Sequence, residues 1–252
     1  CEVNKLGNGT LEPVWSPHSC TYTPGSHVAS TKVTTGWRDT TTNKDTNTGS
    51  STVTGNKAYS GTDLWYGSGS GIRLFQGRTG TRLNYSDFAP TPKTGYSVTG
   101  WWRGSTSNKV PSNQSYWFTS DAAFGPIVTA NSYTVEYWNK AGTTKLSSDT
   151  GFKYDTARNL AAKPSSGVST GYSAVGWSTS TNQSTASYGF GSSQKNLATS
   201  GTKKLYLAET ANRYTVSFNV NCGSCGQSSN VTATYAANMP GISTTKPTRA
   251  GY

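Results

Sequence analysis

The chain has 252 residues and a formal net charge of +11, from 22 Lys and Arg against 11 Asp and Glu. Only 32% of the residues are hydrophobic, which excludes one large aliphatic core, but 8 Trp, 15 Tyr and 7 Phe can anchor several small cores. No apolar stretch is long enough to span a membrane. The basic residues are scattered, with Lys203-Lys204 as the only adjacent pair, which argues against a nucleic-acid-binding patch.

The rest of the composition favours a mainly β fold with many turns. Gly, Ser, Thr and Asn are abundant, whereas Ala, Glu and Leu are few. We expect four consecutive small modules in an elongated array: 1–70, which lacks its first strand, 71–131, 132–211, and a partial module, 212–252. Loops of variable length between constant strands explain why the modules differ in length.

The first two modules are predicted from short strand-like segments and breakers. Residues 27–37 form a strand candidate that ends at Gly36-Trp37, and the Gly/Ser-rich segment 67–71 reads as a flexible joint. In the second module, residues 82–85 and 125–129 are strand candidates on either side of the stiff segment 89–92, which contains two prolines.

The third and fourth modules both begin with a segment that alternates with period two. In such a strand every second side chain lies on one face, so the apolar residues of each segment share a face. These residues are Tyr133, Val135 and Tyr137 in the third module, and Tyr214, Val216, Phe218 and Val220 in the fourth.

The pattern Gly-Tyr-x-x-x-Gly-Trp recurs along the chain. Complete copies occupy residues 95–101 and 171–177, and half copies occupy 36–37 and 251–252. A repeated glycine–aromatic pattern indicates repeated small modules, in which the ring fills a small core and glycine allows a close backbone approach. The residues expected in the module cores are Trp37, Tyr96, Trp101, Tyr172, Trp177, Tyr214, Phe218 and Tyr252.

These residues resemble the Listeria–Bacteroides repeat family, also known as the internalin B-type repeat. That family opens with Tyr-x-Val-x-Phe, as at 214–218, and continues through Pro-Thr-Arg-x-Gly-Tyr, as at 247–252. Its Gly-Tyr-x-x-x-Gly-Trp centre matches 171–177, and its closing strand matches 205–208. The resemblance is strong from residue 90 onward and weaker before it. It implies β-grasp-like modules along bacterial surface proteins, and it implies no catalytic residues.

Both ends of the chain interrupt the expected pattern. The first module lacks its opening strand, and the last reaches only Gly251-Tyr252, the middle of a module. Two explanations are compatible with each other. Either the chain is a segment of a longer repeat protein, or subunits complete one another by exchanging strands at their edges.

The four cysteines fall into two local pairs, Cys1 with Cys20 and Cys222 with Cys225. An even number of locally paired cysteines favours disulfides and an oxidising compartment. The C-x-x-C spacing of Cys222 and Cys225 also occurs in redox enzymes and zinc sites, but here no helix start and no second pair accompanies it. His18 and His27 near Cys20 leave a metal site open as the alternative, and Cys1 could instead carry a lipid anchor.

Three tryptophans lie beside the core positions of the alternating pattern: Trp102, Trp117 and Trp138. An exposed Trp can stack on a sugar ring or form an interface. The expected function is structural, in a stalk, filament or surface layer on the outside of a bacterial cell, with adhesion as an additional role. The alternative is an adhesin that binds cell-wall or host glycans through Trp and basic residues. No catalytic arrangement and no cofactor is expected.

Overall fold

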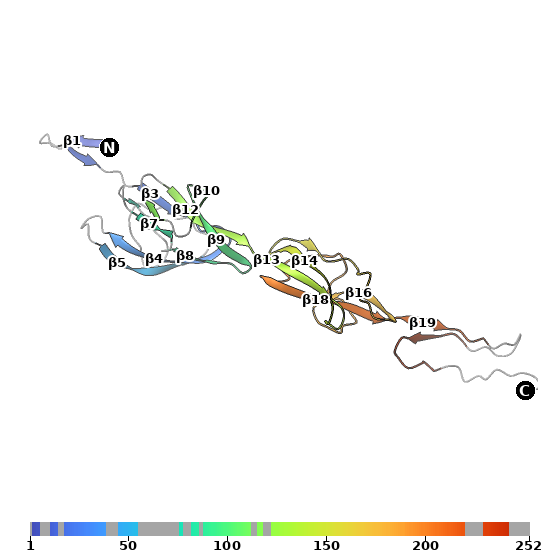
Figure 1. The fold of residues 1–252 in the computed structure, drawn as a ribbon. Coiled ribbons are helices and arrows are strands. Elements are labelled where there is room, and N and C mark those ends of the chain that lie inside the picture. The colour runs from blue at the N-terminus through green and yellow to red at the C-terminus, as the bar shows by residue number, and fades with distance from the viewer. Residues whose placement is uncertain are drawn as a thin grey trace, which may run out of the picture. The chain divides into compact units, whose positions relative to one another are not determined.

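In a computed structural model, the described part of the chain is mainly β-strand and contains no α-helix (Figure 1). The structure describes residues 2–5, 11–14, 18–38, 45–54, 76–77, 82–85, 88–111, 115–117, 122–219 and 229–241. Side chains are described for residues 22–31, 85, 88–111, 123–219 and 229–241. The mainly β class expected from the composition is confirmed.

The chain divides into two compact units, Cys1–Asn131 (unit 1) and Ser132–Tyr252 (unit 2). The strands of unit 1 are β1 (Glu2–Lys5), β2 (Leu11–Val14), β3 (His18–Tyr22), β4 (Val28–Arg38), β5 (Asp45–Thr54), β6 (Gln76–Gly77), β7 (Arg82–Asn84), β8 (Phe88–Pro92), β9 (Tyr96–Arg103), β10 (Ser105–Val110), β11 (Ser115–Trp117) and β12 (Ala122–Ala130). Those of unit 2 are β13 (Ser132–Trp138), β14 (Lys145–Lys153), β15 (Arg158–Asn159), β16 (Tyr172–Ser178), β17 (Ser193–Gln194), β18 (Gly201–Ala211), β19 (Arg213–Val216) and β20 (Val231–Thr234).

The main sheet of unit 2 has four strands in the order β14-β13-β18-β16. β13 and β14 form an antiparallel hairpin, and β16 is antiparallel to β18. β18 runs parallel to β13, with partners from Tyr133–Gly201 to Trp138–Tyr206. The first and last strands of this sheet are therefore neighbours at its centre, and they are joined through the crossover connection that a parallel pair requires.

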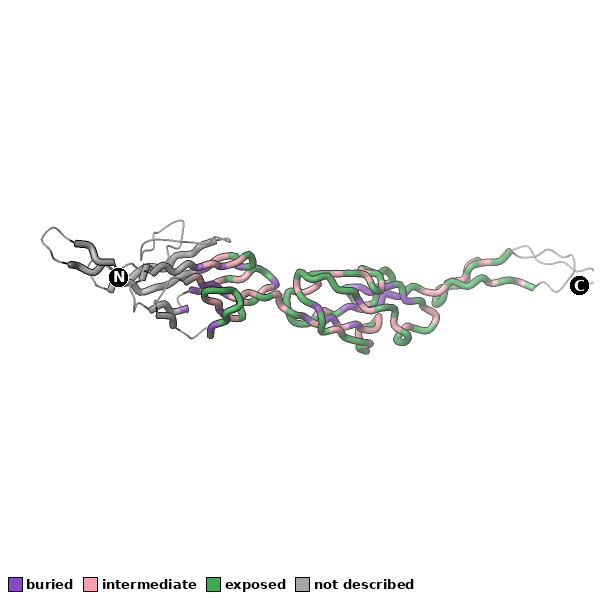
Figure 2. The backbone as a smooth tube through the Cα atoms, turned by 90° about the horizontal axis from the view of Figure 1, so that it is seen from above, coloured by how far each residue is buried: buried purple, intermediate pink, exposed green. Residues whose placement is uncertain are grey.

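One face of this sheet carries the core of unit 2. Tyr133, Val135 and Tyr137 are buried, and the residues between them are only half-buried, so the predicted period-two alternation of β13 is confirmed. Trp177 packs against Tyr137, with ring centroids 4.7 Å apart. The loop residue Ala161 ties both rings, because its N–H donates to the Tyr137 hydroxyl at 3.0 Å and its carbonyl accepts from the Trp177 indole at 2.9 Å. Figure 2 shows the buried positions of this core in purple.

Unit 1 contains a five-stranded sheet in the order β10-β9-β12-β3-β6 and a three-stranded sheet, β5-β4-β8. In the first sheet, β3 is parallel to β12, and β9 is antiparallel to β12. Both sheets combine strands from the ranges 1–70 and 71–131. The division into four modules stays a prediction.

An aromatic cluster forms the described core of unit 1. Tyr22, Phe88 and Phe124 have ring centroids between 4.9 and 5.4 Å apart, and Tyr85 stacks on Trp101 at 5.4 Å. Rings packed at such distances supply large buried areas from few residues, as a chain with little aliphatic content requires.

Equivalent hydrogen bonds follow the last strand of the main sheet in each unit. In unit 1, Asn131 follows β12, and its N–H donates to the Gly95 carbonyl at 2.9 Å, while the Ser97 hydroxyl donates to the Asn131 side chain at 2.6 Å. Unit 2 has identical bonds, again at 2.9 and 2.6 Å, among Gly171, Ser173 and Asn212. Gly95 and Gly171 both have positive φ, +80° and +78°, a conformation that favours glycine.

Candidate functional surface

The face of the unit 2 sheet opposite the core presents an aromatic and charged group of residues: Glu136, Trp138, Lys145 and Lys204, named here the Trp138 surface. Alternation along β13 places Glu136 and Trp138 away from the buried Tyr137. In the sheet register, Glu136 pairs with Lys204 on β18, and Trp138 pairs with Lys145 on β14. Three adjacent strands thus bring these side chains together.

Glu136 is the polar centre of the Trp138 surface. Its carboxylate accepts a bond from Lys145 Nζ at 3.2 Å and one from the Trp138 indole N–H at 3.1 Å. The Lys145 hydrogen bond is the largest cause that lowers the pKa of Glu136, and Lys204 adds a smaller electrostatic effect. Lys204 Nζ lies 4.6 Å from the centroid of the Trp138 ring, within the range of a cation–π contact.

This arrangement presents a half-buried indole with two ammonium groups beside it. Such a surface can bind a sugar ring by stacking and an acidic substituent by charge. Because Lys204 already lies over the Trp138 ring, a ligand on that side must displace the ammonium or bind beside it.

The other two singled-out tryptophans lie in unit 1. Trp102, in β9, is half-buried, and its indole lies beside Gly125 of β12, where a Cβ would stand 2.9 Å from Nε1. Trp117 lies in β11, but its side chain is outside the described side chains. Trp102 therefore lies on the strand beside β12 in unit 1, whereas Trp138 belongs to the sheet of unit 2.

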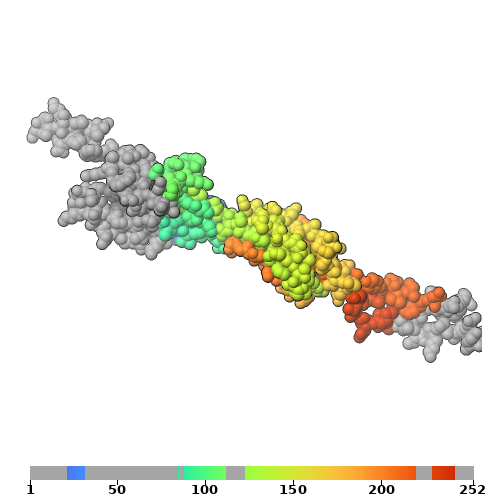
Figure 3. Space-filling model, in the orientation of Figure 1, coloured from blue at the N-terminus to red at the C-terminus, as the bar shows by residue number. Residues whose placement is uncertain are grey.

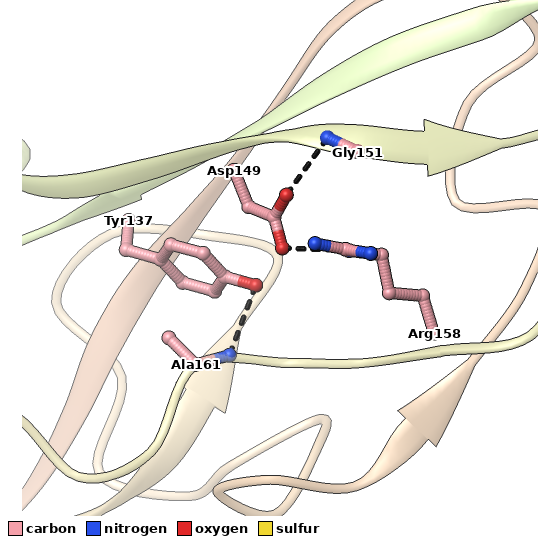
Figure 4. Close-up of polar contacts among 5 residues, drawn as sticks. All are labelled: Tyr137, Asp149, Gly151, Arg158 and Ala161. Atoms are coloured by element: carbon pink, nitrogen blue, oxygen red, sulfur yellow. Dashed lines mark hydrogen bonds and ion pairs between the residues drawn. The ribbon is translucent and has the colours of Figure 1, made fainter.

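A second polar group, which sequence patterns did not single out, lies near the core of unit 2 (Figure 4). Arg158 Nε donates to Asp149 at 2.8 Å, and the other Asp149 oxygen accepts from the Gly151 N–H, also at 2.8 Å. The guanidinium lies over Gly151, where a Cβ would stand 2.6 Å from Arg158 Cζ. The Arg158 bond is the largest cause that lowers the pKa of Asp149, while burial raises the pKa of Tyr137 nearby. These contacts fix β14 against β15, which is a structural role.

Glu209 is the buried carboxylate of unit 2. Its Oε1 accepts from the Ser169 N–H at 3.1 Å, whereas Oε2 has no hydrogen-bond partner among the described residues. Lys140 Nζ donates to the Glu209 backbone carbonyl at 3.3 Å and lies 4.7 Å from the Tyr172 ring centroid. This group joins the end of β18 to the β13–β14 turn.

The residues expected in module cores have different environments. Trp101 and Trp177 are buried, with 5% and 1% exposure, and Tyr96 and Tyr172 are half-buried at the starts of β9 and β16. Tyr214 is 48% exposed, because no described strand covers the β19–β20 hairpin as β18 covers Tyr133. Phe218 is half-buried, the side chain of Trp37 is not described, and Tyr252 lies outside the described residues.

The predicted disulfides stay predictions. Cys1, Cys222 and Cys225 lie outside the described residues, and Cys20 is described only by its backbone in β3. Within the described part of the chain, no group of three His, Cys, Asp or Glu residues could hold a metal ion. A search of the same residues for a helix long and apolar enough to cross the bilayer found none.

Comparison of the chain with protein-family models, with curated proteins and with solved structures gave no match.

Proposed function

We propose that this protein is an extracellular structural protein of a bacterial surface, in which tandem β-grasp-like modules carry mechanical load in a stalk, filament or surface layer. The observation that carries the proposal is the position of the first and last strands in the main sheet of unit 2. β13 and β18 are parallel neighbours, so a force applied at Ser132 and Ala211 loads them in opposite directions along their length. All hydrogen bonds of the pair then resist together, whereas an antiparallel hairpin pulled at its open end loses its bonds one by one.

The recurrence of this arrangement supports a modular protein. In unit 1, β3 and β12 are also parallel neighbours, with β9 beside β12 as β16 is beside β18. The paired contacts at Asn131 and Asn212 add a second correspondence. The strand order in unit 2, with a hairpin, a crossover and a central parallel pair, is compatible with the β-grasp architecture that the resemblance to Listeria–Bacteroides repeats implies.

Force spectroscopy on the whole chain tests the mechanical proposal. Handles at Ser132 and Ala211 load β13 and β18 in shear, and handles at Ser132 and Lys153, which are register partners, peel the β13–β14 hairpin from its end. We expect a clearly higher unfolding force for the first pair at the same pulling rate. Equal forces, or a lower force in shear, would contradict a load-bearing role.

Electron microscopy of native material tests the assembly and the location. The proposal predicts labelled protein on the outside of the cell, within filaments, stalks or a layer that has a regular subunit repeat. Compact monomers alone, or label confined to the cell interior, would contradict it.

A second function, glycan binding, is favoured by the Trp138 surface. A half-buried indole with Lys145 and Lys204 beside it suits a sugar that carries an acidic group. Trp138→Ala should abolish binding on a glycan array, and Val175→Ala, which truncates an exposed residue on β16, should leave binding unchanged. Equal binding by both variants would remove this function from the Trp138 surface.

A further inference from the structure

The β19–β20 hairpin leaves large apolar side chains exposed on unit 2. Tyr214 is 48% exposed, Tyr235 is 40% exposed and Met239 is 52% exposed. Figure 3 shows the hairpin residues 213–219 and 229–241 in orange to red. Apolar side chains exposed close together on a protein surface can mark an interaction site.

The β13–β14 hairpin of the same unit has the same local geometry. Its first register pairs are Ser132–Lys153 and Tyr133–Phe152, which correspond to Arg213–Thr234 and Tyr214–Ala233 in the other hairpin. Asp155 lies two residues after Lys153, and Ala236 lies two residues after Thr234. Both have positive φ, 57° and 56°. The turn bonds also correspond: Thr156 to Lys153 at 3.3 Å, and Ala237 to Thr234 at 3.1 Å.

The two hairpins differ in what lies beside their first strand. β13 pairs with β14 on one edge and with β18 on the other, and its Tyr133, Val135 and Tyr137 are buried. β19 pairs only with β20 among the described strands, and the equivalent Tyr214, Val216 and Phe218 are exposed or half-buried. Among the described strands, β19 therefore has no neighbour that corresponds to β18.

We propose that the edge of β19 opposite β20, which has no partner among the described strands, accepts a β-strand that adds parallel to it and carries leucines at alternate positions, as β18 does with Leu205 and Leu207. Both leucines are fully buried beside β13, and the closing end of β18 is fixed through Asn212. A strand placed likewise beside β19 would satisfy its outward backbone groups and cover the face of Val216 and Phe218. This proposal rests on the modular organisation proposed above, and it specifies which kind of strand would bind at the end of one module.

The position of the hairpin supports acceptance of a strand. Tyr235 packs edge-on against Tyr172, with ring centroids 5.5 Å apart, and its N–H donates to the Asn212 carbonyl at 2.9 Å. The hairpin is thus held to the end of β16 before any further strand is added. A pre-positioned edge lowers the ordering cost of strand addition.

Hydrogen exchange on the whole 252-residue chain tests the proposal with a synthetic peptide of the β18 sequence, residues 201–211. We expect the peptide to slow hydrogen exchange by about tenfold or more at those β19 amides that do not donate to β20. Exchange at the β13 amides should stay unchanged. The control peptide carries Leu205→Asp and Leu207→Asp and should give no protection. Equal protection by both peptides, no protection by either, or changed exchange in β13 would overturn the proposal.

Matched variants of the chain locate the contact. Val216→Lys should abolish the protection, because Val216 lies on the proposed contact face, whereas Thr215→Lys, on the opposite face, should retain it. Loss of protection in Thr215→Lys but not in Val216→Lys would overturn the assignment of the face. Faster exchange at the Tyr235 amide would show that Val216→Lys unfolds the hairpin. In that case the comparison of the β18 peptide with its control peptide on the unaltered chain tests the proposal. A negative result here leaves the shear test of β13 and β18 unaffected, so the two proposals fail separately.

Discussion

The Tyr235 ring lies directly against the Cα of Gly171, in the space that a Cβ at residue 171 would occupy. Gly171 also has a φ of +78°, which side-chain-bearing residues rarely adopt. One glycine therefore permits both the turn into β16 and the seating of the β19–β20 hairpin.

Gly171→Ala should release the hairpin from unit 2. The substitution combines backbone strain of about 1–3 kcal/mol with a clash against the Tyr235 ring. Gly191→Ala is the matched control, because Gly191 has a φ of +66° but open space around its Cβ position. We expect exchange at the Tyr235 amide to accelerate only in Gly171→Ala. Similar acceleration in both variants would assign the effect to strain alone.

The Asp149–Arg158 pair should make unit 2 sensitive to acid. The Arg158 bond lowers the pKa of Asp149 in the folded state, so the stabilisation is present above the ordinary Asp pKa of about 3.9 and is lost as the pH falls through the lower folded value. Asp149→Asn should be less stable than the unaltered chain at pH 7, and this difference should shrink below about pH 4. Urea unfolding across this range measures it, and a difference independent of pH would contradict the ion-pair explanation.

Alkaline pH should destabilise unit 1 through Tyr22. Burial is the main cause that raises the Tyr22 pKa to about 12, and its hydroxyl lies 2.7 Å from the Thr31 hydroxyl. An unfolded Tyr ionises near pH 10, so stability is complete below that pH and falls as the pH rises from about 10 to about 12, by roughly 2–3 kcal/mol. Tyr22→Phe should reduce this pH dependence and lose the Thr31 bond. An unchanged alkaline slope in Tyr22→Phe would refute the assignment.

Trp177 and Trp138 should differ in how much stability is lost on truncation to Ala and in how strongly a quencher reduces their fluorescence. Trp177 is 1% exposed and donates to the Ala161 carbonyl, so Trp177→Ala should cost about 3–5 kcal/mol. Trp138 lies on the opposite face of the sheet, and Trp138→Ala should cost about 1 kcal/mol or less. Iodide should quench the fluorescence that is lost in Trp138→Ala more than that lost in Trp177→Ala. The reverse order would contradict the described burial.

The sequence by itself determined the β class and the alternation of β13. Both follow from local chemistry, since β-branched and aromatic residues at period two specify a half-buried strand regardless of its partner. The Gly-Trp pattern likewise placed Trp101 and Trp177, which are buried. Tyr22, the last residue of β3, and Phe124, the third residue of β12, complete the unit 1 cluster, but neither belongs to a Gly-Trp pattern or to a period-two segment.

Only the tertiary structure decided which strands are neighbours. The parallel pairs β3–β12 and β13–β18 join segments far apart in the chain, and no local signal specifies such pairing. The same reason explains Tyr133 and Tyr214, which share one sequence pattern but differ from 2% to 48% in exposure. A residue's alternation fixes the face on which it lies, and the strand that arrives beside it determines whether that face is buried.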